Sequence, residues 1–375
     1  MDAWIAAAAE RIAARAPEEL ERFVAVSSPS GDVAGAEAAF AVAVSLAPQG
    51  VRVERAPCSS AGHADDLILT VQGSGSRRIV LLGHVDTVVS QADHRSLERD
   101  GEHLTGSGTV DMKGGNVLAL GVLRELALRP EHFAEVALLL VCDEEWRAGD
   151  FVHTERFAGY DACLCFEAGE LTPDAEEAVV VQRKAAGTLR VVAHGRSAHS
   201  GTNPDRGANA LLALAAAAQA VAARHDPRGS EHLTAVPTVV RSGEAFNVVP
   251  ADGELLCDLR ADGLGTFDEV LAGLPANVDG VRLEADLLRV WPGMDARART
   301  APLLLAASER LGRPIRGADR GGASDASHLA PVIDVTIDGL GPRGGGAHTP
   351  REHVVESSLR TRAEVALALV DATLG

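Results

Sequence analysis

Residues 78–86 have the sequence Arg-Ile-Val-Leu-Leu-Gly-His-Val-Asp, an apolar run that ends in two polar side chains. A run that is apolar on both faces predicts a central strand, because helices cover both sides of such a strand. Similar apolar runs occupy residues 136–142 and 162–166, and helical patterns occupy residues 33–46 and 114–128. This alternation predicts an α/β domain with a mainly parallel central sheet and helices on both faces.

The pattern changes between residues 179 and 293. Strand and helix patterns there follow the order β-β-α-β-β-α-β, which is typical of a small open-faced α/β sandwich. We therefore expect this segment to be a smaller domain inserted into a larger one. Residues 1–178 and 294–375 would form the two parts of the larger domain.

Composition and charge exclude several classes of protein. The 375 residues contain 35 basic and 53 acidic side chains, a net charge of −18, which disfavours binding to nucleic acid. No apolar run reaches the roughly 18 residues that a membrane span requires, and the first ten residues lack the basic start of a secretory signal. Five thinly spread cysteines argue against a disulfide framework, so we expect a cytoplasmic protein without membrane partners.

Polar residues follow the first central strand and precede the helix at residues 114–128. His84 and Asp86 point the same way on extended chain, so the carboxylate can hold one ring nitrogen of the histidine, although the pair could also simply cap the strand. Asp111 stands among glycines, and its two oxygens could bridge two cations. The same segment could instead form a capped turn or hold a phosphate at the helix N-terminus. It lacks the glycine patterns of nucleotide-binding loops.

Further acidic residues and a histidine complete the set. Glu144 and Glu145 follow the strand at residues 136–142, where buried acids are costly unless they are paired or bound to metal. Glu167 follows the strand at 162–166, and His348 lies in a glycine-rich loop. Open α/β sheets bind ligands beyond the carboxyl ends of their strands. Two histidines with several carboxylates suit a pair of zinc-like ions, so together these residues predict a two-metal site.

These motifs, in this order along the whole chain, resemble those of the M20 family of metallopeptidases, and most of all its carboxypeptidase G2-like branch. The resemblance implies two Zn²⁺ ions, with Co²⁺ or Mn²⁺ as possible substitutes, and an inserted lid domain that mediates dimerisation. It implies that His84 and Glu167 bind one ion, that Glu145 and His348 bind the other, and that Asp111 bridges them. Asp86 would orient His84, and Glu144 would be the general base.

The resemblance extends to the inserted domain. His199, in Gly195-Arg196-Ser197-Ala198-His199-Ser200-Gly201, resembles a histidine that reaches the partner subunit's site and stabilises the oxyanion. Asn247 and Arg260 match positions that hold the substrate, and Arg260 would grip a carboxylate with its two-pronged guanidinium. Ser324, in the turn at residues 321–325, would line the substrate pocket through its side chain or backbone.

The function implied is hydrolysis of an amide or peptide bond in an N-acyl amino acid or short peptide with a free carboxylate, by a homodimer that acts like a glutamate carboxypeptidase. An N-acyl amino acid deacylase or desuccinylase is an alternative. A second alternative is a catalytically inactive protein on the same fold that binds a metal or another ligand. The intact Glu144 argues against this alternative. A nucleotide- or phosphate-binding α/β protein is a third, which the missing phosphate-binding pattern disfavours.

Overall fold

The computed structural model describes residues 1–147 and 149–375, which divide into two compact units. Unit 1 comprises Met1–Gln182, Asp295–Asp319 and Ser324–Gly375, and unit 2 comprises Arg183–Met294 and Arg320–Ala323. The inserted segment was predicted to span residues 179–293, and the longer part of unit 2 spans Arg183–Met294 in the structure. Residues 179–182 therefore belong to unit 1 and not to the inserted segment.

The central sheet of unit 1 has the strand order β1-β2-β6-β3-β7-β17. Strand β3 is parallel to β6 and β7, and β17 is parallel to β7, whereas β2 is antiparallel to both β1 and β6. Among the described strands of this sheet, β2 thus runs against all the others, and the prediction of a mainly parallel sheet is confirmed. The strands are β1 (Arg52–Ala56), β2 (Asp66–Gln72), β3 (Arg78–His84), β6 (Glu135–Val141), β7 (Ala162–Cys165) and β17 (Thr336–Ile337).

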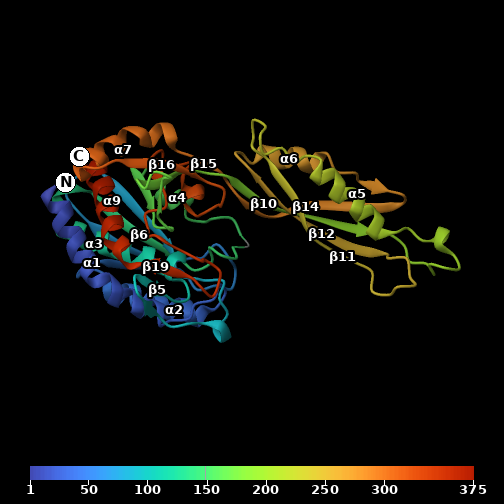
Figure 1. The fold of residues 1–375 in the computed structure, drawn as a ribbon, viewed down its shortest axis with the longest axis horizontal. Helices are drawn as coiled ribbons and strands as arrows, with labels where there is room; N and C mark the ends of the chain where they lie inside the picture. The colour runs from blue at the N-terminus through green and yellow to red at the C-terminus, as the bar shows by residue number, and fades with distance from the viewer. Residues whose placement is uncertain (148) are drawn as a thin grey trace. The chain divides into compact units, whose positions relative to one another are not determined.

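Helices cover this sheet. Strands β3, β6 and β7 are buried along almost their whole length, which requires cover on both faces. Helix α3 contacts β3 and β6, and α8 contacts β7 and β17. Helices α1 and α9 pack on each other and on α3, close to both ends of the chain (Figure 1). The helices of unit 1 are α1 (Ala3–Val24), α2 (Val33–Leu46), α3 (Gly114–Ala127), α4 (Thr154–Phe157), α7 (Arg297–Leu311), α8 (Ala326–Leu329) and α9 (Glu356–Leu374).

Two predicted elements differ in length from the observed ones. The sequence predicts that the first helix ends at residue 16, before Pro17, but α1 continues to Val24. Leu20 and Phe23 are fully buried, so core packing outweighs the hydrogen bond that the proline removes. The apolar run at residues 332–337 predicts a strand, but only β17 forms, because the amide of Ile333 turns back to the carbonyl of Leu329.

Small sheets join distant parts of unit 1. Strand β19 pairs with β5 and β18, and this connects the segment before Gly106 to the loop around His348. Another small sheet has the order β15-β9-β16, with β8 beside β9. These strands are β4 (Glu98–Asp100), β5 (His103–Thr105), β8 (Glu170–Leu171), β9 (Glu177–Arg183), β15 (Met294–Asp295), β16 (Ile315–Arg320), β18 (Gly344–Gly345) and β19 (His353–Val355).

Unit 2 is an antiparallel sheet with helices on one side (Figure 1). Its strand order is β11-β12-β10-β14-β13. Buried positions recur every three or four residues along α5, and this stripe packs on β10, β11 and β12. The elements are β10 (Ala185–His194), α5 (Ala210–Ala222), β11 (Thr234–Ser242), β12 (Asp252–Ala261), α6 (Gly265–Ala272), β13 (Asn277–Val278) and β14 (Val281–Trp291). Along β10, buried residues alternate with half-buried ones from Gly187 onward, as expected for a sheet with one open face.

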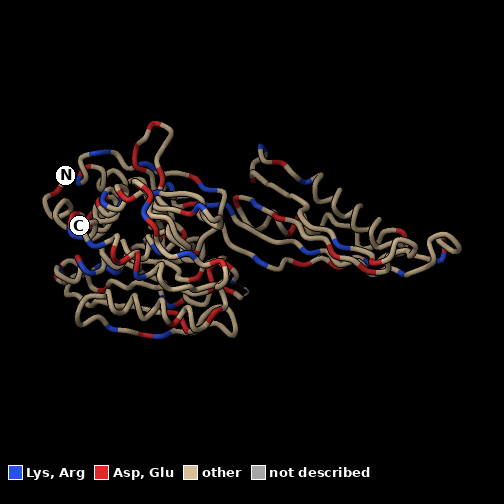
Figure 2. Tube along the Cα trace, turned by 60° about the horizontal axis from the view of Figure 1, so that its bottom comes forward, with Lys and Arg blue, Asp and Glu red and all other residues tan. Residues whose placement is uncertain are grey.

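Charged side chains of both signs are interspersed along each unit (Figure 2). Acidic residues are in excess, 53 against 35 basic ones. In the part of the chain that the structure describes, no helix combines the length and apolar character needed to cross a bilayer.

Candidate metal centre

Three parallel strands place the predicted site residues at one edge of the central sheet. Strand β3 ends at His84, which is in register with Val141 of β6, and Leu82 is in register with Cys165 of β7. The segments that follow β6 and β7 therefore emerge beside His84. These segments carry Glu144, Glu145 and Glu167.

Two groups of possible ligands meet at Asp111. His84 Nε2 lies 3.1 Å from Asp111 Oδ1 and 3.6 Å from Glu167 Oε1. His348 Nε2 lies 3.1 Å from Asp111 Oδ2 and 3.2 Å from Glu145 Oε2. Within each group the ligand atoms lie within 4.8 Å of one another. Asp111 thus presents a different oxygen to each group, which is the arrangement that a carboxylate bridging two cations requires.

The electrostatics of these side chains suit bound cations. Burial works against the charged form of His84, but Asp111 and Asp86 outweigh it and raise its pKa well above the usual value. Hydrogen bonds with Asp111 and Glu145 raise the pKa of His348 to about 10. Burial raises the pKa of Glu145. Without a metal, protons on the histidines balance the negative charge. A divalent cation would replace these protons, since imidazole binds metal in its neutral form. Imidazole and carboxylate donors suit zinc and similar ions, so the residues fit the predicted metals.

Asp86 contacts both His84 and the acidic segment after β6. His84 Nδ1 lies 3.0 Å from the carbonyl oxygen of Asp86 and 3.4 Å from its carboxylate. The same carboxylate accepts hydrogen bonds from the backbone amides of Glu144 and Glu145, at 3.2 and 3.1 Å. Asp86 is 1% exposed. It therefore contacts a predicted ligand and also holds the backbone that carries the predicted base.

Glu144 lies at the turn that follows β6 and is half-buried. Burial raises the pKa of its carboxyl well above the usual value, and the nearby carboxylates of Glu167, Asp325 and Glu145 add to this effect, while His84 opposes it. A carboxyl whose pKa is shifted toward neutrality has the property that a general base needs.

Glu352 is a residue of the site that the sequence analysis missed. Its carboxylate accepts hydrogen bonds from the backbone amides of Gly108 and Val110, both at 2.9 Å, and of Asp111 at 3.1 Å. It is 4% exposed, and burial raises its pKa although the amides oppose this. Glu352 thus holds the loop that presents Asp111. The signal available in the sequence was an acid four residues after His348, in a loop already singled out.

Two other buried residues brace the site. Asn116, near the start of α3, donates a hydrogen bond of 2.6 Å to the carbonyl of His84. The guanidinium of Arg147 is buried between Asp143, at 2.8 Å, and Asp325, at 3.0 Å. Arg147 thereby ties the segment after β6 to the turn at residues 321–325. Neither role was visible in the sequence, because the hydrogen-bond partners of Asn116 and Arg147 are known only once the chain is folded.

Ser324 is buried, and its hydroxyl donates to the carboxylate of Asp338. This bond is internal to unit 1, and a substrate contact by Ser324 stays a prediction. Unit 2 begins with Arg183 and Lys184, and both side chains donate hydrogen bonds to backbone carbonyls. Arg183 donates to Gly322 at 2.8 Å, and Lys184 donates to His232 at 2.6 Å.

The remaining predicted residues belong to unit 2. His199 is exposed, and its Nδ1 accepts hydrogen bonds from the amides of Gly201, at 3.2 Å, and Thr202, at 3.1 Å. The ring proton is therefore on Nε2. The carbonyl of Asn247 accepts a bond from Ser200, so His199 and Asn247 lie on neighbouring segments. Arg260, on β12, pairs with Asp258 at 3.0 Å. The roles of these three residues stay predictions.

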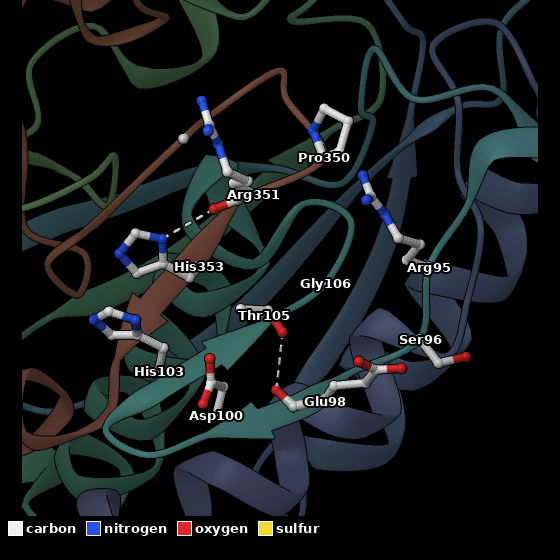
Figure 3. A pocket seen from close by; sticks show the side chains of 11 residues that line it. Arg95, Ser96, Glu98, Asp100, His103, Thr105, Gly106, Pro350, Arg351 and His353 are labelled. Carbon is white, nitrogen blue, oxygen red and sulfur yellow. Dashed lines mark hydrogen bonds between the residues drawn. The ribbon is translucent and has the colours of Figure 1, made fainter.

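A cavity of about 610 Å³ borders the loop that carries His348 (Figure 3). Arg351 of that loop and Arg95 lie on its two sides, and the rings of His103 and His353 lie 4.2 Å apart at its wall. Among the described residues that line this cavity there is no predicted metal ligand. It is thus a separate hollow beside the candidate centre.

Comparisons with known proteins agree with this geometry. A model of the peptidase family M20/M25/M40 matches residues 80–372. Carboxypeptidase G2 from Pseudomonas sp. (strain RS-16) is 26% identical over 374 residues, which cover 94% of this chain and 87% of that protein. Succinyl-diaminopimelate desuccinylase from Stenotrophomonas maltophilia (strain R551-3) is 29% identical over 323 residues, which cover 78% and 83%.

Solved structures share the fold. An M20 family metallo-carboxypeptidase, Sso-CP2 from Sulfolobus solfataricus, superposes with a TM-score of 0.77 at 14% identity, over 96% of this chain and 99% of the other. Aminopeptidase PepT from Bacillus cereus ATCC 10987 superposes with a TM-score of 0.76 at 21% identity, over 97% and 99%. These likenesses confirm the predicted α/β fold.

Proposed function

The chain belongs to the peptidase family M20/M25/M40 and is a metallo-amidohydrolase that acts on amide bonds, and we propose that it uses two divalent cations to release an amino acid from an N-acyl or peptidyl amino acid. The observation that carries the proposal is that Asp111 presents one oxygen to His84 and the other to His348. Zinc is the proposed native metal, and Co²⁺ or Mn²⁺ are proposed substitutes.

Each metal would have its own set of ligands. His84 and Glu167 would bind one ion, Glu145 and His348 the other, and Asp111 both. When bound, the two cations would polarise the scissile carbonyl and lower the pKa of the attacking water. Asp86 and Glu352 would keep the ligand-bearing segments in place, through the backbone hydrogen bonds described above.

Glu144 would move the proton. It lies in the turn after β6 directly beside Glu145, but it belongs to neither group of candidate ligands, so it can face the substrate and not the ions. Its carboxylate would accept a proton from the attacking water and then return it to the leaving amine. Its position supports this role, because the carboxylate of Asp86, which also contacts His84, holds the backbone amide of Glu144 at 3.2 Å.

His199 would stabilise the oxyanion. Its Nδ1 accepts two backbone hydrogen bonds, so Nε2 carries a proton that it can donate. A donor of this kind is typically worth about 10²–10³ in rate. We propose that the enzyme is a cytoplasmic homodimer and that His199 acts in the site of the partner subunit.

A free carboxylate on the substrate is proposed because Arg260 offers a guanidinium on β12, and because carboxypeptidase G2 is among the relatives. Asn247 and Ser324 are proposed as further substrate contacts. The similarity to succinyl-diaminopimelate desuccinylases favours a second candidate function, removal of an acyl group from the nitrogen of an amino acid.

The phosphate-binding alternative is opposed by Glu352. The amides of Gly108, Val110 and Asp111, which a phosphate would need, already donate to this carboxylate. A negative charge at the same place would also be repelled.

The test is a screen of zinc-loaded protein against dipeptides and N-acyl amino acids, with release of free amine as the readout. Cleavage that stops with a chelator and returns with zinc supports the proposal. Preference for acyl groups or for peptides separates the two candidate functions. The Glu144→Gln protein, prepared in parallel, excludes a contaminating hydrolase. If no substrate is cleaved although two metals are bound, the inactive binding protein becomes the better interpretation.

A further inference from the structure

A second cluster of side chains that could bind a metal includes the first residue of the segment that follows β6. Later residues of that segment are Glu144 and Glu145 of the candidate metal centre. Cys58, Asp66 and Cys142 each offer one atom, two sulfurs and one carboxylate oxygen, and these atoms lie within 4.8 Å of one another. Cys58 is in the loop between β1 and β2, Asp66 begins β2, and Cys142 follows β6. None of the three belongs to the ligand set proposed above.

Hydrogen bonds hold two members of the cluster in position. Asp66 accepts a bond of 3.1 Å from the amide of Cys142, and its other oxygen lies 2.8 Å from His153 Nε2. The Cys142 thiol donates to the carbonyl of Ala64 at 3.3 Å. Asp66 is 0% exposed and Cys142 is 2% exposed. The carboxylate and the buried sulfur are thus oriented before any ligand arrives.

Buried polar groups around the cluster would be stabilised by the positive charge of a bound cation. Asp143, which follows Cys142, has a buried carboxylate, and its Oδ2 atom has no hydrogen-bond partner among the described residues. A hydrogen bond with Cys58, burial and the charge of Asp66 all raise the pKa of the Cys142 thiol. Without a cation the sulfur therefore keeps its proton. A bound cation would displace that proton and balance the buried negative charge.

We propose that Cys58, Cys142 and Asp66 bind a thiophilic divalent cation such as Zn²⁺, at a site separate from the catalytic centre. Sulfur ligands select zinc over magnesium or calcium, and a carboxylate completes three positions of a tetrahedron. In such a site two sulfurs lie roughly 3.8 Å apart, a separation compatible with a cluster whose three ligand atoms all lie within 4.8 Å of one another. Cys58 is half-buried in a loop and can adjust its position to a bound ion, whereas Asp66 and Cys142 are buried.

The position of the cluster gives the cation a consequence for catalysis. Cys142 is followed by Asp143, Glu144 and Glu145, so a cation there anchors the segment that carries the proposed base. It joins this segment to the loop between β1 and β2, which backbone pairing alone does not do. The site would act as a structural clip.

The two kinds of site can be told apart by spectroscopy, because the proposed catalytic ligands are nitrogen and oxygen only. The full-length protein is purified under reducing conditions and loaded with Co²⁺. We expect a sulfur-to-cobalt charge-transfer band in the near ultraviolet, and a count of bound ions by native mass spectrometry. Cys58→Ser and Cys142→Ser should each lose the band and bind one ion fewer per chain.

Matched variants make the result specific. Cys257→Ser removes a buried cysteine of unit 2 and should keep both the band and the ion count. His348→Ala disturbs the catalytic centre and should keep the band. If Cys142→Ser does not fold, judged by circular dichroism, Cys58→Ser carries the test alone, because its side chain is only half-buried.

The proposal is overturned if wild-type protein, with its five thiols shown to be reduced, gives no sulfur-to-cobalt band. It is also overturned if the Cys58→Ser protein keeps the band. Neither readout involves amide hydrolysis, so the outcome is independent of the proposed function.

Discussion

Replacing Glu352 by glutamine removes one of the two oxygens that hold the Asp111 loop. In the native protein Oε1 accepts from Val110 and Asp111, and Oε2 accepts from Gly108. The glutamine amide can keep its oxygen toward the first pair, but its NH₂ group then faces the amide of Gly108. One buried donor is left without an acceptor.

The expected loss of free energy follows from the number of hydrogen-bond donors that lose their acceptor. An unsatisfied buried donor costs about 1–3 kcal/mol, and Glu352 is 4% exposed, so solvent cannot compensate fully. If Asp111 moves to relieve the conflict, metal affinity falls by roughly 10- to 100-fold, since about 1.4 kcal/mol corresponds to a factor of ten. Glu352→Ala leaves three amides unsatisfied and should weaken metal binding further.

The assay is competition with a chromophoric zinc chelator, together with the melting temperature of the metal-free protein. The matched control is Glu356→Gln, four residues later, because Glu356 pairs with the exposed Arg99 and such pairs contribute little. The reasoning is refuted if Glu352→Gln and Glu352→Ala both bind zinc as tightly as the wild type while remaining folded.

Other substitutions test separate parts of the site and fold. Glu144→Gln should keep its bound zinc by mass spectrometry yet lose at least ~10²-fold in kcat, because only proton transfer is removed. His199→Ala should lose about 10²–10³-fold, and mixing it with Glu144→Gln protein should restore part of the activity through hybrid dimers; no restoration would argue against a shared site. Arg147→Met leaves two buried aspartates unpaired and should lower the free energy of unfolding by about 3–5 kcal/mol, measured in urea. For Glu177, burial opposes ionisation, but Arg362 outweighs it and lowers the pKa. Its stabilisation is therefore present above the unfolded pKa of about 4.3 and lost as pH falls through the folded pKa, so the difference in melting temperature between wild type and Glu177→Gln should be largest near neutrality and vanish in acid.

Local patterns in the sequence predicted most of the elements. The apolar pattern predicts helices at residues 33–46 and 356–374 and a strand at residues 66–72, and the structure has these elements with the same bounds. These elements have a clear apolar pattern and well-marked ends, and Asp32 caps the first of the helices. The family was recognised from polar residues at strand ends, whose order along the chain is itself a property of the sequence.

The direction of β2 was not predictable in the same way. Its apolar pattern is the same whether it pairs parallel or antiparallel, and the choice depends on β1 and β6 as neighbours. The length of α1 likewise depended on burial of Phe23, which no local pattern indicates past Pro17.

The sequence alone was enough to identify the classes of side chain that could bind metal, because residue type and nearby strand pattern are local properties. It could not show that Asp111 faces His84 with one oxygen and His348 with the other, or that Glu352 holds the loop of Gly108 from 244 residues away. Such contacts arise only when packing of the core brings separate strand ends together, and the free energy of that packing is spread over the whole chain. The same reason explains why Cys58 and Cys142 looked unrelated in the sequence and are neighbours in the folded protein.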